Sequence, residues 1–450
     1  MTAVKEEKNI YLSNFKRFEK EVDGAGDSWL HRIRKSAIKR FAELGFPTTR
    51  NEDWKFTNVD PIAKIPFRPA PGYELDSVSA EQIRHAVFQV PDSIRLVFVN
   101  GQFSPELSTP NSERDGVVVE NLGTVLADHP AWIEPYLTRY AAYDNQAFAA
   151  LNTAFIRDGA FVSIPKGRKA ERPIHLVFVA SSFGEGCVAH PRNLILAGPD
   201  SRATLVETYV GLEEEVYFSN AVTEIVAAEN AVIEHCKIQR ESEEAFHVAT
   251  TQIHQERGSR FTSHFVSLGG ALVRNEVRVG LSAEACECTL NGLYLARDQQ
   301  HVDNHTVIDH AKPHCVSHEL YKGILDDHAH GVFNGKIFVR QDAQKTDAKQ
   351  TNQTLLLSED AVINTKPQLE IYADDVKCTH GATVGQLQDE AIFYLRSRGI
   401  GLEAARGLLT YAFANDVISR VGVGPLRSQL EDYLLSRQQL PRSESDTEVT

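Results

Sequence analysis

Cysteine is scarce in this sequence, and the short motifs of several protein classes are missing from it. Six cysteines in 450 residues are too few for a fold held together by disulfides. No C-x-x-C pair occurs, which excludes a zinc ribbon and a ferredoxin-type cluster motif. The absence of G-x-x-x-x-G-K-S/T and of G-x-S-x-G excludes a P-loop and the nucleophile elbow of the α/β-hydrolases.

Positive charge and long apolar stretches are also lacking. The net charge is −14 at pH 7, and the isoelectric point is near 5.7. Such a chain repels nucleic acids and anionic membrane surfaces, so we expect neither as a partner. No run of 18 apolar residues is present, and the charged N-terminal stretch lacks the apolar core of a secretory signal. Together these features predict a cytoplasmic protein.

Helical periodicity is present at both ends of the chain, and strand-like sequence lies between them. The apolar spacing after residue 28 predicts a helix that Ser28 caps and Gly45 ends. We divide the chain into an N-terminal helical region, a strand with a mixed helical connection, a β-rich core, a C-terminal helical domain and a disordered tail: residues 1–93, 94–158, 159–385, 386–437 and 438–450.

Polar or small positions recur through the later part of the β-rich core. Their intervals are 13, 13, 17, 18 and 14 residues, at Asn291, Asn304, Ser317, Asn334, Asn352 and Lys366. Such spacing is typical of stacked rungs that each cover the one below. We therefore predict a mainly β fold, a right-handed parallel β-helix core flanked by N-terminal and C-terminal helical domains. The six positions should stack in rows, with Val, Ile, Leu and Phe filling the interior. A β-sandwich is the alternative, but it would need tight hairpin turns at most junctions.

Three long stretches resemble a known family. They are "GFPTTRNEDWKFT" at 45–57, the rungs from 320 to 385 that end in "KCTHGATVG", and "FYLRSRGIGLEAARGLLTYAFANDVI" at 393–418. They are similar to the SufB/SufD family of scaffold subunits in the SUF iron–sulfur cluster assembly system. The forms "NEDWKFT" and "KCTHGATVG" favour its SufD members over SufB.

The resemblance implies a function as well as a fold. It implies a non-catalytic scaffold that pairs with a SufB-like subunit through the β-helix and docks a SufC-like ATPase on the C-terminal helices. An iron–sulfur cluster would be held transiently and shared with the partner. Neither the residues nor the resemblance decides whether a flavin binds.

The stretch "KCTHG" contains the two candidate ligands of such a cluster. Residues i and i+2 of a strand lie about 6.6 Å apart along it and point to the same face. Cys378 and His380 should therefore point the same way. A thiolate and an imidazole placed so could bind one metal or cluster, and Gly381 leaves space beside them. Iron–sulfur clusters usually need four ligands. The resemblance implies that His380, and with it Cys378, lies near the SufB-like partner. A purely structural role for both residues is the competing interpretation.

The helix expected after residue 401 has an apolar stripe and a charged side. Leu402, Leu409 and Phe413 should pack on the end of the β-helix. This packing would turn the charged residues toward the ATPase: Glu403, Arg406 and Asp416.

Other metal-ligating residue types in the sequence favour a structural interpretation. Cys286 and Cys288 share a strand face and are predicted to pack in the core. The histidines between 301 and 330 are not spaced as ligands on one helix face, although "DDHAHG" at 326–331 remains a weak metal candidate.

The alternative function is that of an enzyme rather than a scaffold. Other β-helix proteins are metal-dependent hydrolases or lyases that act on carbohydrate. They usually have a long sugar-binding groove rich in aromatic residues. This chain has only 8% aromatic residues, and its C-terminal helical module has no purpose in such an enzyme.

Overall fold

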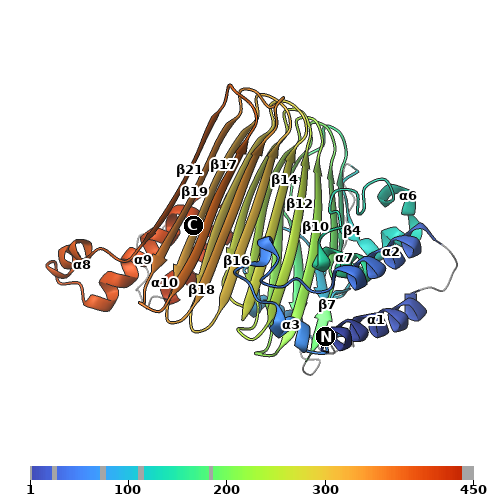
Figure 1. Ribbon diagram of the computed structural model, residues 1–450, viewed down its shortest axis with the longest axis horizontal. Coiled ribbons are helices and arrows are strands. Elements are labelled where there is room, and N and C mark those ends of the chain that lie inside the picture. The colour runs from blue at the N-terminus through green and yellow to red at the C-terminus, as the bar shows by residue number, and fades with distance from the viewer. Residues whose placement is uncertain (1–2, 23–27, 71–77, 110–115, 182–185, 438–450) are drawn as a thin grey trace.

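Two long sheets of parallel strands form the centre of the molecule in the computed structural model (Figure 1). The structure describes residues 3–22, 28–70, 78–109, 116–181 and 186–437, so the tail predicted at 438–450 lies outside it. One sheet runs in the order β20-β18-β16-β14-β12-β10-β8-β5-β4, and the other runs β21-β19-β17-β15-β13-β11-β9-β6-β2-β3. The predicted mainly β fold, a parallel β-solenoid between helical ends, is confirmed.

The first half of the chain contains most of the helices and the first turns of the solenoid. The helices are α1 Ala3–Val22, α2 Trp29–Leu44, α3 Asp60–Lys64, α4 Ala80–Ala86, α5 Leu122–Asp128, α6 Pro130–Ile133 and α7 Ala147–Ala154, with a 3-10 turn at Glu52–Trp54. The strands are β1 Arg68–Pro69, β2 Ile94–Val99, β3 Gln102–Phe103, β4 Val118–Asn121, β5 Ala160–Ile164, β6 Ile174–Ala180, β7 Cys187–Ala189, β8 Arg192–Ala197, β9 Arg202–Gly211 and β10 Tyr217–Ala227.

The second half continues the solenoid and ends in helices. Its strands are β11 Val232–Arg240, β12 Phe246–Gln255, β13 Arg260–Ser267, β14 Leu272–Leu281, β15 Glu287–Ala296, β16 His301–His310, β17 Val316–Leu325, β18 His330–Val339, β19 Asp347–Leu356, β20 Val362–Ile371 and β21 Lys377–Gly385. Its helices are α8 Asp389–Arg396, α9 Leu402–Ile418 and α10 Gly424–Arg437. None of the helices in the described part of the chain is both long and apolar enough to cross a membrane.

From β8 to β19, each strand pairs in parallel with the strand two places later, because successive strands alternate between the sheets. Leu272 pairs with His301, and His301 pairs with His330, each 29 positions further along. The repeat of 13 to 18 residues seen in the sequence is thus half a turn. The predicted rows are wrong in detail. Of the six recurring positions only Asn334 and Lys366 are paired, and the observed amide ladder joins Asn275 to Asn304.

The space between the sheets is partly polar, which the sequence prediction of an aliphatic interior missed. Glu207 and His235 form a buried pair at 3.1 Å. The buried Lys237 ammonium donates to Asn275 at 3.0 Å and lies 2.9 Å from the ring of His247. Burial lowers the pKa of Lys237 to about 8. Stacked turns place these side chains within reach of one another, so they supply hydrogen-bond partners to one another.

Helix α2 has the predicted boundaries. The Ser28 side chain accepts a hydrogen bond from the His31 N–H, and Gly45, at φ 66°, closes the helix on the carbonyl of Phe41. The "NEDWKFT" stretch then crosses the outer face of the first sheet. The Arg274 guanidinium lies 3.7 Å from the centre of the Trp54 ring, and the Thr57 hydroxyl donates to Asp303.

Helices α9 and α10 lie on the outer face of the second sheet, where α9 contacts β15 and β17. They bury Ile418, Leu426, Leu430 and Leu434 against strand residues such as Leu293. The prediction that α9 packs on the end of the β-helix is therefore wrong. Leu402 is 42% exposed, whereas Phe413 packs against the cluster that Ala414, Val417 and Ile418 form with the sheet.

Glu319 provides a test of the polar interior. Its carboxyl group is 3% exposed and accepts a hydrogen bond of 2.6 Å from Gln350. Burial raises the pKa of Glu319 from 4.5 to about 7. Between these pH values the unfolded chain releases the proton first, so this group reduces stability as the pH rises. We predict that Glu319→Gln stabilises the protein at pH 8, by up to about 3 kcal/mol, and has little effect at pH 4.5.

Urea unfolding of both proteins from pH 4.5 to pH 8 measures this difference. Glu359→Gln, at an exposed position, is the matched control. A difference between variant and parent that does not grow with pH would contradict the assignment of a buried carboxylic acid.

Candidate functional site

The solenoid is open at its C-terminal end. Strands β20 and β21 are the last strands of their sheets, so each has one edge without a partner strand among the described residues. None of the ten residues of β20 and none of the nine of β21 is buried. In contrast, most residues of β18, one turn earlier, are buried. Unpaired strand edges of this kind are ready-made surfaces for pairing with another chain.

The strand register places Cys378 and His380 at the mouth of this open end. Cys378 pairs with Ala348 and His380 with Gln350. Ala348 and Gln350 are each 1% exposed because they point into the space between the sheets. Since paired residues share a face, Cys378 and His380 point into the same space where no further turn covers them. They therefore share a face, and nothing lies within 4 Å of a Cβ built on Gly381.

The two side chains differ in their surroundings. Cys378 is half-buried and packs beside Ile337, Val339 and Ala348. Burial, together with the Asp347 carboxylate, raises the pKa of its thiol, so a metal would have to displace the proton. His380 is exposed and forms no hydrogen bond within the described residues. His380 is therefore the more available donor.

The mouth contains too few donors to hold a cluster alone. No group of three or more His, Cys, Asp and Glu side chains within the described ranges is placed to hold a metal ion. Around the mouth, several large apolar side chains are exposed instead: Val362 at 50%, Ile371 at 39%, Tyr372 at 59% and Val384 at 44%. Exposed apolar groups around a polar centre are typical of a protein–protein interface.

The structure separates the three charged residues that the sequence placed on one docking face. Glu403 is exposed in the first turn of α9. Arg406 donates to the carbonyl of Leu357 at 3.1 Å, and Asp416 binds the ammonium of Lys322 at 2.9 Å. Arg406 and Asp416 thus hold α9 on the solenoid.

An exposed apolar patch on α8 and the start of α9 was missed from the sequence. Its members are Phe393, 74% exposed, Tyr394, 55% exposed, Leu402 and Leu408. Helix α8 projects away from the solenoid (Figure 1) and buries none of its residues. Two adjacent aromatic residues in so short a helix are the signal that could have revealed the patch.

Comparison with known proteins agrees with this architecture. The model of the SufBD N-terminal region matches residues 5–176, and that of the SufBD core domain of SUF iron–sulfur cluster assembly matches residues 178–413. The chain belongs to the SufBD family. It is 36% identical to a SufBD family iron–sulfur cluster assembly protein of Synechocystis sp., over 92% of this chain and 93% of the relative.

Two proteins named SufD are also similar to this SufBD chain. The Escherichia coli protein is 33% identical over 87% of this chain and 89% of its own length. The Bacillus subtilis protein is 26% identical over 93% of this chain and 95% of its own length. The family therefore connects this SufBD protein with iron–sulfur cluster assembly.

Four of the other five cysteines of this SufBD protein are buried, and the fifth, Cys187, is half-buried. The prediction that Cys286 and Cys288 pack in the core is confirmed, since each is at most 1% exposed. Cys236 and Cys315 are buried as well.

We predict that a thiol reagent modifies only Cys187 and Cys378 in the native protein, and the other four only after unfolding. Mass-mapped alkylation with and without urea measures this, and rapid native labelling of Cys288 would contradict the packing.

Proposed function

We propose that this protein is a non-catalytic scaffold subunit for iron–sulfur cluster assembly, acting in the cytoplasm. The observation that supports it is the open end of the solenoid, where β20 and β21 have free edges and no buried residue. A SufB-like subunit, built on a similar solenoid, pairs there. Pairing would cover the exposed Tyr372 and Val384 and bring a second set of side chains to the mouth.

The nascent cluster is then held between the two subunits. His380 supplies one nitrogen ligand, and Cys378 supplies a sulfur ligand or supports the strand. The partner supplies the ligands that this chain lacks, because four are the usual number. A site completed only by pairing holds the cluster transiently, since separation of the subunits removes half of its ligands. The cluster is cargo rather than a resident cofactor.

A SufC-like ATPase docks on the patch of Phe393, Tyr394, Leu402 and Leu408. Glu403 lies exposed beside this patch and contributes to docking. Arg406 and Asp416 act by fixing α9 on the solenoid through Leu357 and Lys322. ATP binding and hydrolysis in the docked subunit could then move α8 and α9, which are attached directly after β21.

The first prediction here concerns His380. His380→Ala removes an exposed imidazole that forms no hydrogen bond with the described residues, so the free energy of unfolding should change by less than about 1 kcal/mol. Iron and sulfide bound by the reconstituted complex should fall severalfold. The same measurement on Cys378→Ala should show a smaller loss. His328→Ala is the matched control, because this histidine is 68% exposed on a turn.

Complex formation is followed in parallel by gel filtration. Normal iron and sulfide content with His380→Ala would overturn the assignment of a ligand. Loss of pairing itself would instead make His380 an interface anchor.

The second prediction separates the two docking surfaces. Removing residues 400–437 would expose the sheet that α9 and α10 cover, so point substitutions are the better test. Phe393→Ser with Leu402→Ser should abolish capture of the SufC-like ATPase and leave pairing with the SufB-like subunit intact. Tyr372→Ser with Val384→Ser should do the reverse. If either double variant loses both partners, or neither, the assignment of the surfaces is wrong.

The carbohydrate-enzyme alternative has no observation in its favour. Both family models that match belong to the SufBD proteins, and together they span residues 5–413 apart from one position.

A further inference from the structure

A large cavity is lined by residues of α1 and β7, among others. Figure 1 shows these elements at the other end of the solenoid, far from β21 along the stack of strands. Its volume is about 1060 Å³, enough for a sizeable small molecule. Its walls come from α1, from the segment around β1, from the β2–β3 turn, from residues 155–158 and from β7. None of these residues belongs to the open end that contains Cys378 and His380, or to the apolar patch on α8 and α9.

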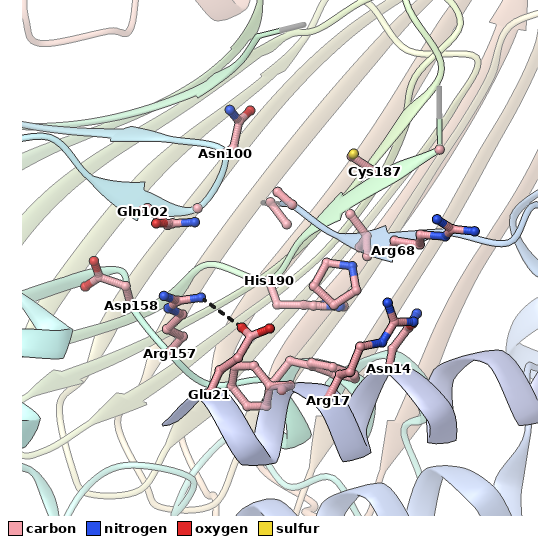
Figure 2. A pocket seen from close by; sticks show the side chains of 18 of the residues that line it. Asn14, Arg17, Glu21, Arg68, Asn100, Gln102, Arg157, Asp158, Cys187 and His190 are labelled. Atoms are coloured by element: carbon pink, nitrogen blue, oxygen red, sulfur yellow. Dashed lines mark hydrogen bonds and ion pairs between the residues drawn. The ribbon is translucent and has the colours of Figure 1, made fainter. Parts of the chain in front are cut away.

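Three arginines line this cavity (Figure 2). Arg17 extends from α1, Arg68 from β1, and Arg157 from the segment that follows α7. The guanidinium of Arg68 makes no hydrogen bond or ion pair within the described residues. Among the described residues, Arg17 donates only to the neutral amide of Asn14, at 3.1 Å. Two of the three cations therefore have no carboxylate partner, although both are held on regular secondary structure.

The two carboxylates of the cavity do not compensate these arginines. Glu21 pairs with Arg157, at 3.9 Å. Asp158 accepts hydrogen bonds from the N–H groups of Gly123 and Phe103 and from the Asn121 amide, so both its oxygens are used by its own surroundings. The cavity thus retains unpaired positive charge around Arg17 and Arg68, in a protein whose net charge is −14.

Part of the cavity wall is apolar. Phe18, Phe155, Ile65 and Val188 line the cavity. The ring of His190 stacks on Phe155 at 5.0 Å between centroids. Its Nδ1 accepts from the Asn220 amide, which leaves Nε2 with the proton and without a partner although it is buried. A buried donor without a partner costs free energy that a ligand could recover.

We propose that this cavity binds a small organic molecule that bears a phosphate group. Arg17 and Arg68 bind the phosphate, because a phosphate monoester has nearly two negative charges and guanidinium groups match its oxygens. The apolar body of the ligand lies against Phe18 and Phe155. Gln102 and Asn100, from the β2–β3 turn, line the rim on the other side.

Cys187 makes the proposal measurable, because its half-buried thiol lies in the cavity wall. Cys378 is half-buried at the far end of the solenoid and serves as an internal control. The full chain is alkylated with iodoacetamide in the presence of 1-naphthyl phosphate, inorganic phosphate or 1-naphthoate, and each cysteine is followed by peptide mass mapping. At a concentration ten times its Kd, the ligand should slow labelling of Cys187 about tenfold and leave Cys378 unchanged.

We expect 1-naphthyl phosphate to protect at lower concentration than inorganic phosphate, and 1-naphthoate to protect least. Arg17→Gln with Arg68→Gln should remove the protection without altering thermal unfolding, whereas Arg50→Gln, an exposed arginine outside the cavity, should keep it. The proposal is overturned by any of three results: no probe protects Cys187, the naphthoate protects as well as the phosphate ester, or protection persists in the double arginine variant.

Discussion

Parallel pairing between successive turns is the constraint on which this molecule depends. Each strand of the solenoid uses the previous turn of its own sheet as a template, and a residue shares a face with its partner about 29 positions away. A change of register by one residue would turn every inward side chain outward. This rule explains why Cys378 and His380 point into the mouth, since Ala348 and Gln350 beneath them already point inward.

The same stacking makes a polar interior possible. A lone Glu or Lys between two sheets would be too costly to bury, but side chains from neighbouring turns are close enough to pair. Glu207 with His235, and Lys237 with Asn275, show this arrangement. Stability is thus distributed over contacts between adjacent turns, as in other repeat proteins, and the last turn is the one with fewest partners.

Local signals in the sequence were sufficient where a local contact decides the structure. Ser28 and Gly45 bound α2 because a cap needs only its own turn of helix. The half-turn spacing indicated the solenoid, but not which residues would pair. Asn304 lies on a row with Asn275, which precedes Asn291, the first of the recurring positions, by about half a turn.

In the candidate site, too, some features follow from the local sequence and others depend on residues that are distant in sequence. That Cys378 and His380 share a face follows from strand geometry alone, whereas their position at an open end depends on how all preceding turns stack. The roles of Arg406 and Asp416 depend on Leu357 and Lys322, which are distant in sequence, so the helical pattern could not distinguish a docking residue from one that holds the helix in place. The arginine cavity draws on several widely separated segments and has no sequence signature.

The two ends of the solenoid are not alike. At the beginning, β3 and β4 run antiparallel to their neighbours, and helices pack beside them, so a further parallel turn has no template there. At the end, β20 and β21 present such a template. Two solenoids that pair through these edges can therefore meet only with their open ends facing each other. Because neither outer end offers such edges, no third solenoid can be added in this way. The fold allows a closed pair of solenoids and prevents a fibre.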